Sequence, residues 1–184
     1  MVRPLFRRQP KDTIAALYGC IVAQARDPRF YTAYAVPDTV LGRFDLIVLH
    51  LALVLRRFRQ GDKAARALAQ GVFDTFCRDM DHNLRELGTS DQGVPRQMRR
   101  VAEAFYGRAQ AYDAALANSR KSALADALAR NVYADTGEQG AVVAGHLGAY
   151  VRQAIAMLDE QSLENLVRGV VRFPDQAGQP IAAE

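Results

Sequence analysis

The chain has 184 residues, of which 49% are hydrophobic and 24% charged, and this length and balance suit one soluble domain with a sizeable core. Its net charge of +4 favours anionic partners only mildly. Residues 1–11 lack the apolar segment of a signal peptide, and no run reaches the roughly 20 apolar residues of a membrane-spanning helix. Cys20 and Cys77 form no C-x-x-C motif, which suits a reducing compartment.

Apolar residues at helical spacing predict helices from the beginning of the chain. The first is expected from the N-cap residue Asp12 to residue 27, and a short helical turn with proline at its first position follows over residues 28–34. A third helix is predicted over residues 39–59. Because its stretch 46–55 is apolar on nearly every side, neighbouring helices should cover it and make it the central helix of the fold.

The helix predicted for residues 63–87 carries more charge than a core helix needs, and Gly88 supplies its stop. Its apolar stripe consists of Leu68, Val72, Phe76, Met80, Leu84 and Leu87. Its opposite side carries Asp74, Arg78, Asp81, His82 and Arg85, with Asp79 and Glu86 at the flanks. The plain interpretation is a solvated face with i,i+4 pairs such as Asp74 with Arg78. The alternative is a face that binds a partner.

The rest of the chain is also predicted to be helical. A corner over residues 89–95 leads to helices expected over residues 95–116, 124–132, 142–158 and 163–169. Residues 136–140 are the most loop-like interior stretch. Alternation with period two, the signature of a strand, occurs only over residues 170–173. We therefore predict an all-α, single-domain bundle of about seven helices around a buried central helix.

The expected domain covers residues 12–173. Before it, residues 1–11 form a basic arm that is predicted to be flexible. Candidates in this arm for attraction to an anionic membrane surface are Arg3, Phe6, Arg7 and Arg8. After the domain, residues 174–184 are rich in glycine, proline and alanine and are predicted to be disordered.

Three sequence blocks stand in a fixed order along the chain. They read V-P-D-T-V-L-G-R-F-D at residues 36–45, F-D-T-F-C-R-D-M-D-H-N-L-R-E-L-G at residues 73–88, and F-Y-G-R at residues 105–108. In this order and at these separations they resemble the ubiquinol–cytochrome c chaperone family, the assembly factors for cytochrome b of the respiratory bc1 complex. The resemblance covers residues 12–173. It departs from the family pattern after Gly88, where an apolar residue is expected, so the conformation of this corner stays open.

The resemblance implies a non-catalytic assembly chaperone that holds newly made cytochrome b until it receives haem and joins the bc1 complex. Cytochrome b is therefore the expected client, with a small partner assembly factor or the ribosome as further candidate partners. The family also implies a cytoplasmic protein that is peripheral to the cytoplasmic face of the inner membrane, in a bacterial member. No nucleic acid is expected as a partner.

The client or partner surface is expected around the three blocks. Its candidate residues are Asp38, Arg43, Asp45, Asp74, Arg78, Asp81, Arg85, Glu86, Tyr106 and Arg108. For the charges at the start of the 39–59 helix, helix capping is the plain interpretation. The alternative is that Arg43 or Asp45 is buried against a charge on another helix, for instance Asp74 or Arg108, because a lone buried charge would be too costly.

No cofactor or metal is expected. Asp74, Asp79 and Asp81 have the wrong spacing to face one ion from one helix. His50 and His146 lie in apolar helical sequence, where a bis-histidine haem site is one hypothesis and a hydrogen-bonded core histidine the plainer one. The sequence also holds no nucleophile elbow, phosphate loop or dinucleotide fingerprint, so nothing in it indicates an enzyme.

Two other function classes remain open. The basic pI of about 9.3 favours a helical nucleic-acid-binding module, although the basic residues are interleaved with acidic ones and form no stripe. The apolar central helix favours an all-α protein that binds or carries a lipid or quinone at the membrane surface.

Overall fold

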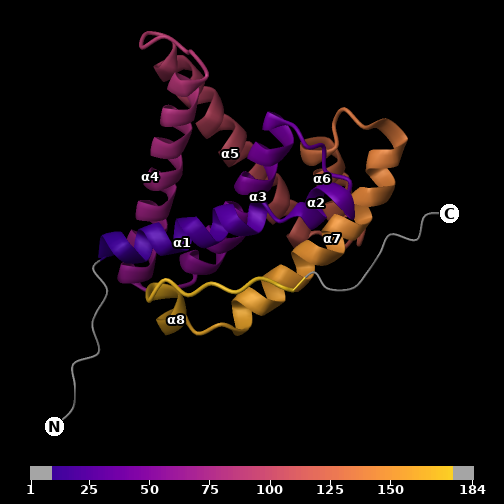
Figure 1. Cartoon of the computed structure of the whole chain (residues 1–184). Coiled ribbons are helices and arrows are strands. Elements are labelled where there is room, and N and C mark those ends of the chain that lie inside the picture. The colour runs from indigo at the N-terminus through magenta and orange to yellow at the C-terminus, as the bar shows by residue number, and fades with distance from the viewer. Residues whose placement is uncertain (1–9, 176–184) are drawn as a thin grey trace.

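The computed structural model describes residues 10–175, and within that range the chain forms eight helices and no strand. Their bounds are α1 Pro10–Ala25, α2 Pro28–Thr32, α3 Val40–Arg59, α4 Lys63–Glu86, α5 Val94–Ala117, α6 Ala123–Val132, α7 Gly137–Glu160 and α8 Leu163–Val167. The helices pack into one body, from which α4 and α5 project side by side as an arm (Figure 1). The predicted all-α bundle is confirmed, and two of its helices are only single turns.

Helix α3 is the centre of the body. It packs against α1, α4, α5, α6 and α7, and every residue from Leu46 to Val54 is buried. Fully burying one leucine or isoleucine side chain contributes about 1.5–3 kcal/mol, so this helix supplies much of the core. Because its own neighbours cover its apolar residues, the apolar character that favoured a lipid carrier is explained by packing.

The beginning of α3 is set by a side-chain cap and a close turn. The hydroxyl of Thr39 accepts a hydrogen bond from the backbone N–H of Gly42 over 3.1 Å, as a threonine N-cap does. A Cβ atom at Gly42 would lie 2.0 Å from the carbonyl oxygen of Pro37. Only glycine therefore lets the 36–39 turn fold back against the first turn of α3.

A buried polar network ties α3 to α1 and α7. The His50 ring is fully buried, with Nδ1 2.7 Å from the carbonyl oxygen of Leu46 and Nε2 2.8 Å from the hydroxyl of Tyr150. Gln24 donates to the same hydroxyl over 3.2 Å. Burial lowers the pKa of His50 to about 4, so the ring is neutral at physiological pH. With both ring nitrogens engaged, His50 is a hydrogen-bonded core histidine, whereas His146 is exposed on α7; the two do not form one haem site.

Several element boundaries differ from the prediction. Helix α1 begins at Pro10, so Asp12 lies inside its first turn and is not the N-cap. Helix α7 begins at Gly137, inside the stretch predicted to be a loop, and Gly137 itself adopts a positive φ of 61°. Residues 1–9 and 176–184 lie outside the described residues. The expected membrane-surface residues and most of the expected tail therefore stay predictions.

One described helix has the length and composition to cross a membrane. This is α7, in which residues Gln139–Glu160 have a mean hydropathy of 1.2 in their most apolar window, although 44% of that window is buried inside the fold. Its buried residues include Leu147, Val151 and Leu158, which pack on α6 and α3. The same composition is expected of a core helix in a soluble protein.

The arm ends in the corner that the sequence left open. Helix α4 stops at Glu86, and Gly88 takes a φ of 85°. The N–H of Thr89 then donates to the carbonyl of Leu84 over 3.0 Å, which closes the helix in the manner of a Schellman motif. Gly88 is therefore the helix stop that the sequence predicts, and the polar residue after it does not change this ending.

We expect Gly42→Ala to lower the free energy of unfolding by about 2–3 kcal/mol, because the new methyl group overlaps the Pro37 carbonyl and the turn must shift. The matched control is Gly19→Ala on α1, where a Cβ meets nothing within 4 Å and helix propensity should add about 1 kcal/mol of stability. Urea denaturation followed by circular dichroism measures both changes. Equal effects of the two substitutions would contradict this account of the turn.

Candidate functional site

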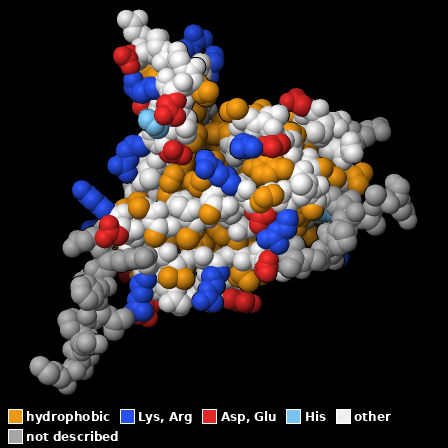
Figure 2. All heavy atoms as spheres, viewed as in Figure 1, with side chains coloured by type: hydrophobic (Ala, Val, Ile, Leu, Met, Phe, Trp, Pro, Cys, Tyr) orange, Lys and Arg blue, Asp and Glu red, His pale blue; other side chains and the backbone are white. Residues whose placement is uncertain are grey.

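Apolar side chains gather in the angle between the arm and the body. Val40 and Leu41, in the first turn of α3, are 73% and 54% exposed, and Leu87 at the end of α4 is 70% exposed. In the space-filling view, hydrophobic atoms lie in the angle below the projecting arm with basic side chains beside them (Figure 2). Exposed large apolar side chains that lie together, unlike scattered single ones, are typical of an interaction site.

These side chains line a groove of about 680 Å³, here called the arm groove. Its apolar lining consists of Val40, Leu41, Phe44, Ile47, Met80, Leu84, Leu87, Val101 and Ala104. Its polar lining consists of Arg26, Arg43, Asn83, Glu86, Gln97 and Arg100. The volume is within the range of ligand-binding clefts, and such clefts combine an apolar lining with a few polar groups.

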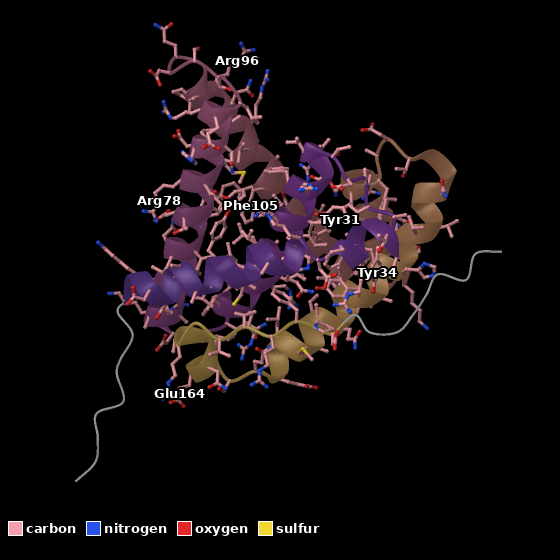
Figure 3. All side chains as sticks on the ribbon, viewed as in Figure 1. Tyr31, Tyr34, Arg78, Arg96, Phe105 and Glu164 are labelled. Carbon is pink, nitrogen blue, oxygen red and sulfur yellow. The ribbon has the colours of Figure 1, made fainter. Side chains whose placement is uncertain are left out.

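The arm groove exists because the apolar stripe of α4 is longer than the body that covers it. Val72 and Phe76, near the body, are fully buried, Met80 and Leu84 are half-buried, and Leu87 is mostly exposed. In α5, Val94 at the tip is buried, Val101 is half-buried, and Phe105 nearer the body is buried again. Figure 3 shows Phe105 at the root of the arm and Arg96 at its tip. The last turns of the arm therefore keep an apolar face without a partner in the described fold.

The rim of the groove is mainly basic. Arg43 is held by Asp38 over 2.7 Å, and its guanidinium lies 5.7 Å from the centre of the Tyr31 ring. The same guanidinium lowers the pKa of the Asp38 carboxyl. Arg26 and Arg100 are exposed and form no ion pair with the described residues. An apolar segment with acidic flanking residues would complement this rim.

A buried ion pair lies at the root of the arm. The Arg108 guanidinium of α5 approaches the Asp45 carboxylate of α3 to 2.7 Å, with side chains 18% and 3% exposed. Burial raises the pKa of Asp45 to about 6, and the attraction of Arg108 opposes that rise. The Arg108 guanidinium also lies 5.7 Å from the centre of the Phe44 ring. This confirms the expectation that Asp45 is buried against Arg108.

The polar atoms around this pair are not all satisfied within the described fold. Arg108 Nε and the hydroxyl of Tyr112 are buried and make no hydrogen bond. Asp45 Oδ1 lies within ion-pair distance of Arg108 Nη2, but this contact lacks hydrogen-bond geometry. Burial, with the nearby Asp45 carboxylate, also raises the pKa of Tyr112. Because such a pair is costly to desolvate, its best-supported role is to fix how α5 packs on α3.

The outer side of α4 is a solvated charged face. Asp81 accepts from Arg85 over 2.7 Å, and Arg85 also pairs with Asp91 in the corner. The expected pair between Asp74 and Arg78 is replaced by other contacts, because Asp74 accepts from Gln70 and Arg78 donates to Thr75. Of the two residues expected to be buried against another helix, Asp45 is the one that is, whereas Arg43 pairs with the exposed Asp38 that precedes its own helix.

The acidic residues of α4 do not converge on one point. Asp79 accepts a hydrogen bond from the Tyr18 hydroxyl of α1 over 2.6 Å, while Asp74 and Asp81 bond to other partners. Burial, together with this hydrogen bond, raises the pKa of Tyr18. Among residues 10–175, no three His, Cys, Asp or Glu side chains are grouped as metal ligands.

The candidate residues therefore separate into four places, one of which is the outer face of α4 with Asp74, Arg78, Asp81 and Arg85. Arg43 and Glu86 lie on the rim of the arm groove, and Asp38 holds Arg43 there. Asp45 and Arg108 are inside, so they support a client site only by holding the arm. Tyr106 is 60% exposed against Phe73 on another part of the arm, with ring centres 5.6 Å apart. Met80, Leu84 and Leu87 were expected only as part of an apolar stripe. The other groove residues that the sequence did not indicate as a site are Arg26, Val40, Leu41, Phe44, Ile47, Asn83, Gln97, Arg100, Val101 and Ala104.

Comparisons with known proteins identify the relatives of this chain. The sequence model of the ubiquinol–cytochrome C chaperone family matches residues 32–173. The ubiquinol–cytochrome-c reductase complex assembly factor 1 of Xenopus laevis is 26% identical over 166 residues, which is 89% of this chain and 82% of that protein. The protein of the same name from Mus musculus is 26% identical over 173 residues, 92% of this chain and 58% of its own length.

A solved structure has the same fold. The crystal structure of the Cbp3 homolog from Brucella abortus superposes with a TM-score of 0.82 and 44% sequence identity, covering 90% of this chain and 91% of that one. Its similarity extends over most of the helices, and therefore over the arm as well as the body.

We expect Arg108→Met to lower the free energy of unfolding by about 3–5 kcal/mol at neutral pH, because Asp45 is left as an uncompensated buried charge. The pKa of Asp45 in the folded variant should rise further above its unfolded value. A folded pKa above the unfolded one means that stability increases as the pH falls, so part of the loss should return between about pH 7 and pH 5.

Urea denaturation at several pH values measures this dependence. Adding Asp45→Asn to the variant should flatten it, because the titrating group is gone. Arg85→Met, which breaks only exposed pairs, those with Asp81 and Asp91, is the control and should change stability little. A loss for Arg108→Met that does not depend on pH would show that Asp45 does not carry the buried charge.

Proposed function

This chain belongs to the ubiquinol–cytochrome c chaperone family, and from that premise we propose that it is a non-catalytic assembly chaperone that binds newly made cytochrome b for the bc1 complex. The names of its relatives in Xenopus and mouse, both assembly factors of ubiquinol–cytochrome c reductase, support this assignment. The observation that carries the proposal is the arm groove, an open apolar surface of about 680 Å³ that the described fold leaves without a partner.

The groove has the chemistry that an unassembled membrane protein needs. Cytochrome b is apolar along its membrane-spanning helices, and such a helix exposed to water buries its apolar surface wherever it can. Helix-in-groove recognition lays one face of a helix along such a lining. The apolar residues come from three helices, so a client helix would bridge the arm and the body.

The basic rim adds orientation and keeps the contact reversible. Arg26, Arg43 and Arg100 surround the apolar lining, Glu86 is the one acidic residue among the described residues that line the groove, and Asp38 pairs with Arg43. Charges at the rim of an interface steer association and set register more than they raise affinity. In this proposal the acidic or polar residues that flank the client segment face the arginines. Because these rim contacts add little affinity, the client can be released.

The charged outer side of α4 is a further part of the proposed client surface. Asp74, Arg78, Asp81 and Arg85 lie beside the groove-lining turns of the same helix, where they would meet polar parts of the client or a small partner assembly factor. The ribosome is a second candidate partner. The proposed location is the cytoplasmic face of the inner membrane, as a peripheral protein, where cytochrome b is inserted.

We expect Leu41→Glu with Leu87→Glu to abolish assembly without unfolding the protein, because both side chains line the groove and both are exposed. The readout is the b-type haem signal in reduced-minus-oxidised spectra of membranes from a deletion strain that carries the variant gene. Val142→Glu with Val170→Glu is the matched control, since these exposed residues lie away from the groove and should restore the signal fully. A normal signal with the groove variant would exclude the groove as the client site.

We expect the exchange of Asp81→Arg with Arg85→Asp to weaken client binding while net charge and helix content stay the same. This pair is exposed on the arm, and Arg85 also pairs with the exposed Asp91, so reversal changes surface charges that a partner meets rather than the core. The same exchange at the exposed Glu164 and Arg168 pair of α8 is the control. Co-purification of cytochrome b measures the outcome, and equal recovery with both exchanges would confine the client to the apolar part of the groove.

A further inference from the structure

A second hollowed surface lies at the opposite end of α3, and the proposed client site does not use it. Arg56 and Arg59, in the last turns of α3, line two adjoining hollows at once. One has about 430 Å³ and is completed by Gln60, Asp113, Leu116 and Ala117. The other has about 280 Å³ and extends over Arg66, Phe73, Phe105 and Tyr106. The two hollows together are called the arginine shelf.

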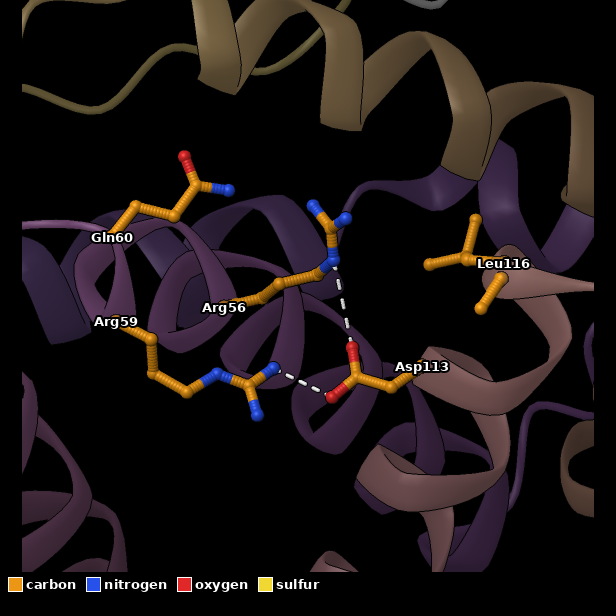
Figure 4. Close-up of a pocket in the computed structure, with 6 residues that line it drawn as sticks. Arg56, Arg59, Gln60, Asp113 and Leu116 are labelled. Atoms are coloured by element: carbon orange, nitrogen blue, oxygen red, sulfur yellow. Dashed lines mark hydrogen bonds and ion pairs between the residues drawn. The ribbon is translucent and has the colours of Figure 1, made fainter.

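The arginines of the shelf keep free donors although they have an acidic neighbour. Arg59 Nη2 lies 2.6 Å and Arg56 Nε 3.5 Å from the two carboxylate oxygens of Asp113, and Figure 4 shows both guanidinium groups converging on that residue. A guanidinium has five N–H donors, so one carboxylate neither satisfies nor neutralises both. Arg66 is exposed and has no acidic partner within residues 10–175. The shelf therefore has a surplus of positive charge.

Apolar and aromatic side chains lie directly beside these cations. Tyr106 is 60% exposed and rests on Phe73, while Leu55, Ala69 and Ala109 are half-buried in the same hollow. Gly107, next to Tyr106, faces open space, with nothing within 4 Å of a Cβ built on it. No helix of the described fold packs closely against Gly107. Because glycine has no side chain, the surface of α5 has a depression beside Tyr106.

We propose that the arginine shelf binds the headgroup region of an anionic phospholipid, with the phosphate at Arg59 and Arg66 and with Tyr106 at the boundary of the hydrocarbon. Arginine binds phosphate oxygens through two parallel N–H bonds, and tyrosine is enriched where a protein meets the membrane interface. Charge and apolar surface lie side by side on the shelf, as the phosphate and acyl chains do in a lipid.

The division of the shelf into two hollows favours a lipid over a client helix. One hollow has about 280 Å³ and the other about 430 Å³, whereas the arm groove is a single opening of about 680 Å³, and a helix with side chains is about 10–12 Å wide. Leu41 in the arm groove and Arg59 on the shelf lie about 27 Å apart along the α3 axis, at 1.5 Å per residue. The membrane contact and the client groove can therefore be occupied together.

The inference rests on the membrane location in the proposed function, and it names the face and the lipid class of that contact. It does not depend on cytochrome b as the client. The test therefore uses the purified full chain and vesicles alone. Because the basic residues 3–8 stay in every variant, their contribution to vesicle binding is constant.

The experiment is flotation with vesicles of phosphatidylcholine alone or mixed with phosphatidylglycerol. We expect the wild-type chain to float with the anionic vesicles and to stay behind with the neutral ones. Arg59→Gln with Arg66→Gln should lower the partition coefficient by about 25-fold, taking about 5-fold for each basic residue at the surface. Arg96→Gln with Arg99→Gln, exposed on the arm, removes the same charge and should change flotation much less.

Tyr106→Ser separates the shelf from simple charge attraction. It leaves the net charge unchanged, and it should lower partition most clearly at high salt, where electrostatic attraction is screened. The groove variant with Leu41→Glu and Leu87→Glu should float like the wild type, so loss of the client site and loss of the shelf are distinguishable. Equal flotation of the two double-arginine variants, or no flotation of the wild type, would overturn the proposal. If the variant with Arg59→Gln and Arg66→Gln floats like the wild type but is defective in bc1 assembly, the shelf binds an acidic protein partner instead of a lipid.

Discussion

The geometry of this molecule depends on the buried ion pair between Asp45 and Arg108. It joins α3, the central helix, to α5, and it lies where the arm leaves the body. The pair is not a large source of stability, since burial raises the pKa of Asp45 even with the guanidinium beside it. Its effect is to allow one packing of α5 on α3. It also explains why the blocks at residues 36–45 and 105–108 occur together, because each supplies one half of it.

The other features of the proposed client site follow from an arm fixed at its root. The apolar stripe of α4 continues past Phe76, where the body ends, and leaves Leu84 and Leu87 facing the exposed first turn of α3. The turn at Gly42 and the stop at Gly88 set the two sides of the opening. Arginines line its rim, where like charges oppose the approach of a second copy of the chain.

The sequence predicted the fold and part of the site, for identifiable reasons. The predicted ranges 39–59 and 63–87 agree with α3 and α4 to within a residue, because the caps that begin these helices, at Thr39 and Asp62, are local hydrogen bonds. The partner of Asp45 was among the expected choices, because a buried charge needs an opposite one. The groove was not predicted, since periodicity shows that Phe76 and Leu87 share a face but not where the covering helices end. Val40 and Leu41, apolar in a first turn, were the available signal. The family resemblance was confirmed.

The central claim is that the arm groove receives cytochrome b, and site-specific photo-crosslinking in cells tests it most directly. A photoreactive amino acid at Leu87 would report what lies in the groove, and the same amino acid at Val142, exposed on α7, would report random encounters. The account predicts a crosslink to cytochrome b from Leu87 that disappears once bc1 assembly is complete, and none from Val142. A crosslink of equal strength from both positions, or one from Val142 alone, would contradict it.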